Sequence, residues 1–163
     1  MNQATYLYRI SQLLSRFREQ VKILSSNGEF SINIHSENIL IKILNLLYEC
    51  DLENTNYSEG KTYPSIDLRD KNGKIAFQIT SIANLEKVRN TIEKFIKYGL
   101  YKEFQELYIY IITDKQNSYN QTKINKATKG LFKFSKTQIL DRSDLYKLLN
   151  ERNNLNVLKE VHN

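Results

Sequence analysis

Apolar residues in the first fifty positions recur with the period of amphipathic helices. The first predicted helix ends at the Ser-Ser-Asn-Gly sequence of residues 25–28, which has the character of a helix C-terminus. Its apolar positions are Tyr6, Ile10, Leu13, Leu14, Phe17, Val21 and Leu24. A second helix is predicted from Ser36, a suitable N-cap, to about Glu49. Glu37 then lies in its first turn, beside the inward face.

The next part of the chain predicts a β-hairpin. Pro64–Lys71 and Lys74–Ser81 have strand character, and Asn72-Gly73 between them is a strong signal for a two-residue type I′ turn. In such a turn, opposed residue numbers sum to 145, so Asp67 faces Gln78 with side chains roughly 5 Å apart. The other face of the hairpin then carries Ile66, Leu68, Phe77 and Ile79.

The remaining pattern predicts an α/β fold. Asn84 is positioned to cap a third helix, and the apolar run Leu107–Thr113 predicts a strand covered on both faces and parallel to its neighbour through a right-handed crossover. Thr137–Leu140 predicts a short last strand, and Ser143–Leu149 a final helix capped by its first residue. The chain has one proline, no repeat and no linker-like stretch, so a single domain over residues 1–163 is expected.

Composition narrows the class of protein. Of 163 residues, 40% are hydrophobic and 26% charged, which disfavours a disordered, collagen-like or disulfide-stapled chain. One cysteine, Cys50, with His35 and His162, cannot supply a usual Cys/His zinc site, so a metal would be held by oxygen. No apolar run is long enough to span a bilayer, and we expect a cytoplasmic protein without a membrane partner.

The charge is unevenly distributed. Residues 1–60 carry five basic and seven acidic side chains, whereas residues 61–163 carry nineteen and eleven. One segment without any acidic residue holds six lysines, namely Lys115, Lys123, Lys126, Lys129, Lys133 and Lys136. Lysines interleaved with aromatic residues suit contact with nucleic-acid phosphates, and a solvated lysine-rich loop is an equally weighted alternative.

The order of these features resembles a known superfamily. An acidic residue on a helix (Glu37), an aspartate on one hairpin strand (Asp67), an amide on the next (Gln78) and a crossover helix resemble the PD-(D/E)XK restriction-endonuclease-like superfamily. The stretch from about Ile34 to Gln116 is similar to the SMEK domain of bacterial proteins, often found at the N-terminus of larger defence-like proteins. The resemblance implies a restriction-endonuclease-like core of α-β-β-α-β order, with a mixed central sheet flanked by helices. Residues 1–33 would form an N-terminal helix, 34–114 the core, and 115–163 the basic stretch, short strand and C-terminal helix.

The resemblance also implies an activity. Glu37, Asp67 and Gln78, with the backbone carbonyl of Ile79, would bind Mg²⁺ or Mn²⁺ and hydrolyse DNA phosphodiester bonds, in an anti-phage or restriction-type defence role. Thr80 stands where the superfamily signature has lysine. Lys87, in the first turn of the third helix, is the candidate for the displaced catalytic cation. The six-lysine segment would contact nucleic acid, DNA being favoured over RNA, and a homodimer or a larger defence complex is the expected assembly.

Two other interpretations stay open. The missing lysine at Thr80 and the neutral Gln78 also suit an inactive nuclease-like domain that binds nucleic acid or a protein. The small size of the chain also suits an interaction or dimerisation module with no nucleic-acid role. Taken singly, Glu37 is equally well explained as a first-turn acid that stabilises the helix dipole. Gln78 taken singly is better explained as a polar residue on a half-exposed strand face.

Overall fold

The centre of the molecule is a five-stranded mixed sheet in the order β1-β2-β3-β4-β5. The computed structural model describes residues 2–26, 34–57, 60, 62–152 and 159. The strands are β1 (Leu52–Asn54), β2 (Leu68–Asp70), β3 (Ile75–Thr80), β4 (Glu106–Ile111) and β5 (Ile139–Leu140). The first three are antiparallel neighbours, and β3, β4 and β5 run parallel. The predicted crossover from β3 to a parallel strand is thereby confirmed.

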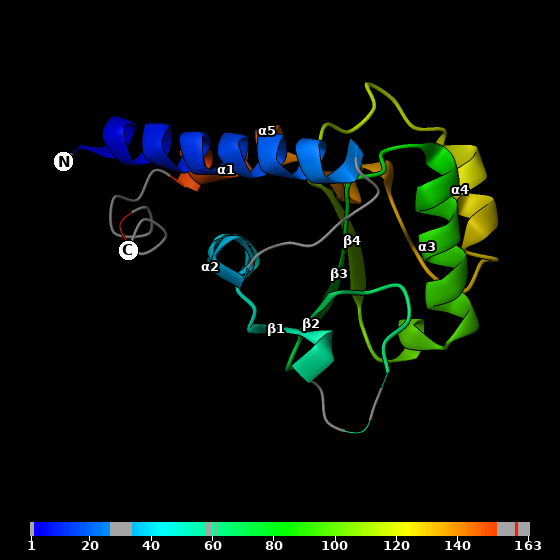
Figure 1. Ribbon diagram of the computed structural model, residues 1–163. Coiled ribbons are helices and arrows are strands. Elements are labelled where there is room, and N and C mark those ends of the chain that lie inside the picture. Colours follow the sequence, from blue (N-terminus) through cyan, green and yellow to red (C-terminus); the bar gives the residue numbers. More distant parts are fainter. Residues whose placement is uncertain (1, 27–33, 58–59, 61, 153–158, 160–163) are drawn as a thin grey trace.

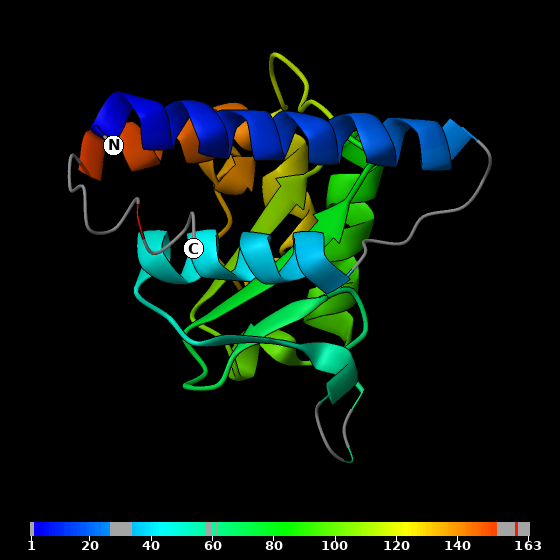
Figure 2. The ribbon, with the colours of Figure 1, turned by 60° about the vertical axis from the view of Figure 1, so that its left-hand side comes forward.

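Helices cover both faces of this sheet, which confirms the predicted α/β class (Figure 1). They are α1 (Gln3–Ser26), α2 (Ile34–Tyr48), α3 (Leu85–Lys97), α4 (Gln121–Ala127) and α5 (Arg142–Arg152). Short 3-10 helices occupy Thr55–Tyr57, Leu100–Lys102 and Lys136–Gln138. Helices α1, α2 and α5 lie on one side of the sheet, and α3 and α4 lie on the other (Figures 1 and 2).

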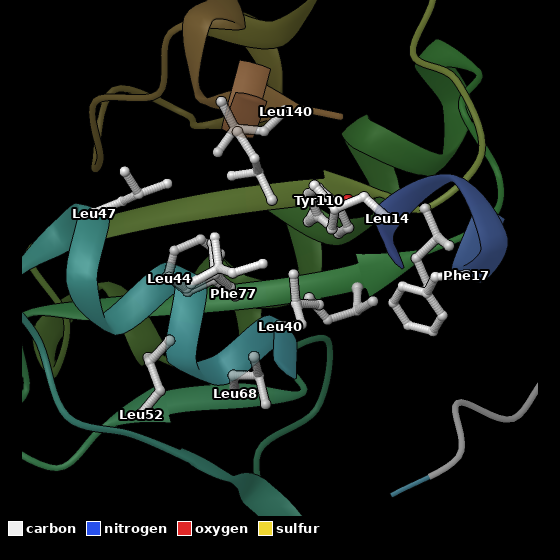
Figure 3. Close-up of a cluster of buried hydrophobic side chains, with 14 of the residues drawn as sticks. Leu14, Phe17, Leu40, Leu44, Leu47, Leu52, Leu68, Phe77, Tyr110 and Leu140 are labelled. Carbon is white, nitrogen blue, oxygen red and sulfur yellow. The ribbon is translucent and has the colours of Figure 1, made fainter. Parts of the chain in front are cut away.

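Two apolar clusters form the core, one on each face of the sheet. Figure 3 shows the first, where Leu14 of α1 and Leu44 of α2 pack over Phe77 and Tyr110. The second cluster lies under α3 and α4 and includes Ile109. Successive residues of β4 therefore enter opposite clusters, as expected of a strand covered on both faces.

The predicted hairpin register is confirmed, but the predicted turn type is wrong. Leu68 pairs with Phe77 and Arg69 with Ala76, so opposed numbers sum to 145. Gly73 has a positive φ of 72°, whereas Asn72 does not, and a type I′ turn needs positive φ at both residues. The turn is organised by the buried Asp70, whose carbonyl oxygen accepts the Gly73 N–H at 3.0 Å. Its carboxylate accepts the backbone N–H groups of Asn72, Lys74 and Asp51 at 3.3, 3.1 and 3.0 Å.

Strand β2 is shorter than predicted because the chain turns away at Asp67. The Asp67 N–H donates to the Phe77 carbonyl at 2.8 Å, and its carboxylate accepts the Ile79 N–H at 2.7 Å. The Asp67 carboxylate thus accepts an N–H group of β3 where a backbone carbonyl of β2 would otherwise continue the pairing of the two strands. As a result, Ile66 enters the cluster under α3, and its predicted place on the same face as Leu68 is wrong.

Three boundary predictions also need correction. Helix α2 begins at Ile34, so Ser36 lies inside its first turn and is not the N-cap. The cap of α5 is Asp141, whose carboxylate accepts the Ser143 N–H at 3.0 Å, and Ser143 lies inside the helix. Strand β1 was not predicted, because its three residues carry no readable alternation. The cap of α3 is confirmed, since the Asn84 side chain accepts the Lys87 N–H at 2.8 Å.

Helix α1 is bound to parts of the chain that lie far away in sequence. The Arg142 guanidinium donates to Ser15 Oγ at 3.0 Å and lies 3.7 Å from Asp114, which also pairs with Arg18. This contact fixes α1 along α5 (Figure 2). Within the described ranges, neither α1 nor any other helix combines the length and apolar character needed to cross a bilayer.

Candidate functional site

A polar cleft of about 780 Å³ opens beside the hairpin, on the side of the sheet that α3 covers. Three predicted site residues line it from three different segments: Asp67 just before β2, Gln78 in β3 and Lys87 in the first turn of α3. Its other lining residues are Thr55, Asn56, Gly60, Thr62, Tyr63, Pro64, Ser65, Ile66 and Lys94. The hairpin and the crossover helix therefore bring these three side chains together.

Asp67 is half-buried and held in place by the sheet. One oxygen of its carboxylate, Oδ2, accepts the Ile79 N–H at 2.7 Å. Burial raises the pKa of Asp67 above its ordinary value, against the opposing effects of the Ile79 N–H and the Lys87 charge, while the Glu37 charge raises it further. A carboxyl group in a cleft whose pKa is shifted by burial and by identified charges is typical of functional sites.

Glu37 approaches Asp67 from the opposite face of the sheet. It lies in the first turn of α2, as predicted, and both of its carboxylate oxygens accept from Asn54 Nδ2 at 3.0 Å. Its negative charge contributes to the raised pKa of Asp67, so the two carboxylates lie within electrostatic range of each other. Glu37 is not among the residues that line the cleft.

Two neighbouring residues of β3, Gln78 and Ile79, are joined by a hydrogen bond. Gln78 Nε2 donates to the Ile79 carbonyl at 3.1 Å, so two predicted metal ligands are in mutual contact. Thr80 is buried, and its hydroxyl accepts the Ile82 N–H at 3.1 Å. Thr80 therefore shapes the turn after β3 and brings no positive charge to the cleft.

The oxygen atoms at this site suit a hard divalent cation. Among the described residues, no three or more His, Cys, Asp or Glu side chains form a cluster that could hold a metal. An ion here would depend on Glu37 and Asp67, with the Gln78 amide oxygen and the Ile79 carbonyl. Mg²⁺ is commonly bound by one or two carboxylates together with water and substrate phosphates, so Asp67 is the carboxylate of the cleft that could serve as such a ligand.

The six predicted nucleic-acid lysines separate into two groups. Five of them are exposed on α4 and on the segment that follows it, namely Lys123, Lys126, Lys129, Lys133 and Lys136. Lys115 is half-buried, and its ammonium group lies 2.8 Å from Asp144 and 3.4 Å from the Ile139 carbonyl. Helix α4 packs against α3, so the two lysines on α4, Lys123 and Lys126, belong to an element on the same side of the sheet as Lys87.

Two further cleft residues, Lys94 and Ser65, were assigned no role from the sequence, where Lys94 is less well placed than Lys87 as the catalytic cation. Lys94 lies two helical turns beyond Lys87 on α3 and lines the same cleft, a relation that the spacing of seven residues could have indicated. Ser65 has a left-handed backbone with φ of 69°, and its buried Oγ has no hydrogen-bond partner in the part of the chain that the structure describes. Nothing in the sequence around Ser65 signals this conformation.

Ser65→Gly is expected to raise the free energy of unfolding by about 0.5 kcal/mol. A left-handed backbone costs a non-glycine residue roughly 1–2 kcal/mol, and glycine removes this cost from the folded state. The extra freedom of glycine in the unfolded chain opposes this stabilisation by about 0.4–1 kcal/mol. Urea unfolding measures the change. Ser118→Gly is the matched control, because Ser118 is exposed with an ordinary φ and should lose stability. Equal losses in both variants would contradict the prediction.

A known protein family matches most of the chain. A family model described as the SMEK domain matches residues 9–150. The matched range begins inside α1 and ends inside α5, so it includes the whole sheet and the cleft. No curated protein and no solved structure matches the chain.

Proposed function

The chain belongs to the SMEK domain family, and from that premise we propose that its cleft is the active site of a metal-dependent nuclease that hydrolyses DNA phosphodiester bonds. The observation that carries the proposal is the convergence of Asp67, Gln78 and Lys87 in one polar cleft. The order of α2, the hairpin, α3 and β4 is compatible with a restriction-endonuclease-like core, with β1 as an additional strand. A role in bacterial defence is part of the same proposal.

Four groups would hold the divalent cation: the carboxylates of Glu37 and Asp67, the amide oxygen of Gln78 and the carbonyl of Ile79. A bound Mg²⁺ or Mn²⁺ activates water and stabilises the charge that develops on a phosphate. The Ile79 N–H keeps the Asp67 carboxylate in one orientation, and Asn54 does the same for Glu37. Because Gln78 is neutral, the site carries one negative charge fewer than an all-acid version and should bind the ion less tightly.

We assign to Lys87 the role of stabilising the negative charge on the phosphate. Lys87 lines the same cleft as Asp67, and its positive charge opposes the increase in the pKa of that carboxyl group. Thr80 has no positive charge, and its hydroxyl is already hydrogen-bonded to the backbone. Lys94, two turns further along α3, would contact the strand beyond the reacting phosphate.

Lys87→Ala is expected to lower the rate of plasmid cleavage at saturating DNA by about 10²-fold, since losing one well-placed donor to transition-state charge costs 10²–10³-fold. Lys94→Ala is the matched control, because it removes the same charge from the same face of α3. That variant should weaken DNA binding and leave the rate at saturation nearly unchanged. Gel-based cleavage kinetics over a range of DNA concentrations separate the two effects. Identical behaviour of the two variants would contradict the role of Lys87.

The experiment that tests the proposed function is incubation of the purified protein with supercoiled plasmid in Mg²⁺ or Mn²⁺, beside an EDTA control and Asp67→Ala. We expect nicking that requires the metal and is lost in the variant. Persistence of the nicking in Asp67→Ala would assign it to another site or to a contaminating nuclease. Absence of cleavage by folded wild-type protein with either metal would contradict the proposal for this chain alone.

A second candidate function is a nuclease-like domain that binds nucleic acid without cutting it. The contact between Gln78 Nε2 and the Ile79 carbonyl favours it, because this hydrogen bond occupies an oxygen that the metal would need. It predicts DNA binding that weakens steeply with salt and is lost when the five exposed lysines are neutralised, without any cleavage. In that case DNA stays the partner, and the protein would act within a homodimer or a larger defence complex.

A further inference from the structure

A second cavity, of about 950 Å³, shares no lining residue with the cleft. Its walls come from the start of β4, from α4 and from the segment between α4 and β5. Phe132 and Leu131 supply its apolar surface, and amide side chains such as Asn125 and Gln105 supply its polar surface. None of the residues assigned to the metal site lines it.

The backbone is strained where it presents Leu131 to this pocket. Helix α4 is followed by two left-handed residues in succession, Lys129 with φ of 51° and Gly130 with φ of 69°. The lysine adopts a conformation that is unfavourable for a side chain with a Cβ atom. It turns the chain so that Leu131 is 53% exposed at the pocket. A large apolar side chain exposed in a pocket is typical of a binding site rather than of a core.

The wall of the pocket is rigid before any ligand binds. The Gln121 amide donates to the Phe134 carbonyl at 2.9 Å and accepts the Lys136 N–H at 2.8 Å. The Gln138 amide accepts the Ser135 N–H at 2.8 Å and donates to the Leu107 carbonyl at 3.0 Å. On its other side, the Phe132 ring packs against Phe95 with centroids 5.1 Å apart. A preorganised wall of this kind lowers the entropic cost of binding.

The charge around the pocket selects the kind of ligand. Lys133 lines the pocket, and Lys129 and Lys136 are exposed beside it in the chain. The sequence contains no acidic residue from Lys115 to Leu140, and Glu106 is the acidic member among the lining residues. A ligand that suits this surface has a flat apolar ring with hydrogen-bonding edges and a phosphate next to it.

We propose that this pocket binds an unpaired base of single-stranded nucleic acid. The base would lie against Phe132 and Leu131, its edge would meet the amides of Asn125 and Gln105, and the flanking phosphates would meet the lysines. Stacking of a base on an aromatic side chain is the common way in which proteins hold single strands. The inference rests on the proposed function to the extent that both assign a nucleic-acid partner. It adds that the substrate contains an unpaired segment.

The test compares two fluorescent single-stranded oligonucleotides of equal length and charge, one normal and one abasic, in EDTA, by anisotropy. Wild-type protein should bind the normal strand at least about 10-fold more tightly, since the abasic strand has no base to stack on Phe132. Leu131→Ser and Phe132→Leu should reduce this preference to nearly one. Ile23→Ser is the matched control, because Ile23 is 64% exposed on α1, across the sheet, and should change nothing.

The binding experiment separates the base pocket from the nuclease proposal. Equal affinity of the wild-type protein for the two strands would overturn the base pocket and leave the nuclease proposal standing. A preference that survives Leu131→Ser and Phe132→Leu would also overturn it, provided that circular dichroism shows folded variants. A preference that these variants abolish, in a protein that does not cut plasmid with metal, would support the pocket while contradicting the nuclease proposal. No binding of either strand would overturn the inference and the nucleic-acid partner together.

Discussion

Asp67→Asn is expected to lower metal-dependent plasmid cleavage by more than about 10³-fold, because the metal ion supplies several kcal/mol of transition-state stabilisation. The same substitution should raise the melting temperature at pH 7. Asparagine has the shape of aspartate and an oxygen that can still accept the Ile79 N–H, but it carries no charge that burial penalises. Cleavage kinetics and thermal unfolding on the same preparations measure both effects. A variant that loses activity together with stability would indicate a structural aspartate instead.

The stability effect should depend on pH in a defined direction. The pKa of Asp67 in the folded protein is raised above its ordinary value of 3.8. Its contribution to stability is therefore fully present below that value and is lost as the pH rises through the folded pKa. The difference in melting temperature between Asp67→Asn and the wild-type protein should be largest at pH 7 and should vanish below pH 3.8. A difference that does not change with pH would contradict burial of the charge as its cause.

The charged carboxylate of Asp67 is disfavoured by burial, which indicates that this residue is selected for a role other than stability. Structural aspartates elsewhere in the chain are placed differently: the side chain of Asp70 accepts three backbone N–H groups in the hairpin turn. Asp67 accepts one, and it lies beside an open cleft. Loss of activity with gain of stability is the usual result of neutralising a functional residue.

Asp70→Ala should produce the largest loss of stability, about 2–4 kcal/mol, since Asp70 is fully buried and a hydrogen bond to a charged acceptor contributes about 1.5–3 kcal/mol. Three N–H groups, from Asp51, Asn72 and Lys74, would lose their acceptor at once. Urea unfolding measures the effect. Asp51→Ala is the control, because that carboxylate is exposed, 3.6 Å from Lys71, and exposed ion pairs contribute about 0–1 kcal/mol. Equal losses for Asp51→Ala and Asp70→Ala would show that the turn does not depend on Asp70.

The fold was readable from the sequence where local patterns determine it. The hairpin register followed from Asn72-Gly73 and from the residues on either side of it, because a one-residue shift would expose the apolar face. The type of turn was not readable, since it depends on a side chain, Asp70, that reaches N–H groups on both sides of the turn and on Asp51. The wrong face assigned to Ile66 has a similar cause: the Asp67 side chain replaces a backbone bond.

The sequence predicted the principal residues of the candidate site but not all of the residues around them. Asp67, Gln78 and Lys87 come together because the hairpin and the helix cap are local features. The pairing of Lys115 with Asp144 was not predictable, because it joins segments whose contact depends on the position of α5. The strained Ser65 likewise has no local sequence signal. Chemical roles at the cleft stay predictions until the variants are measured.

The attachment of α1 to α5 has a consequence for synthesis of the chain. Ser15 and Arg142, which join the two helices, are 127 residues apart in sequence. At about 5–20 residues per second, α1 leaves the ribosome roughly 6–25 s before its partner exists. During that interval the side chains of Leu14 and Phe17 can pack only against the members of their cluster that are already made, such as Phe77 and Tyr110. Helix α1 therefore completes its packing only when α5 has been made, long after α1 itself.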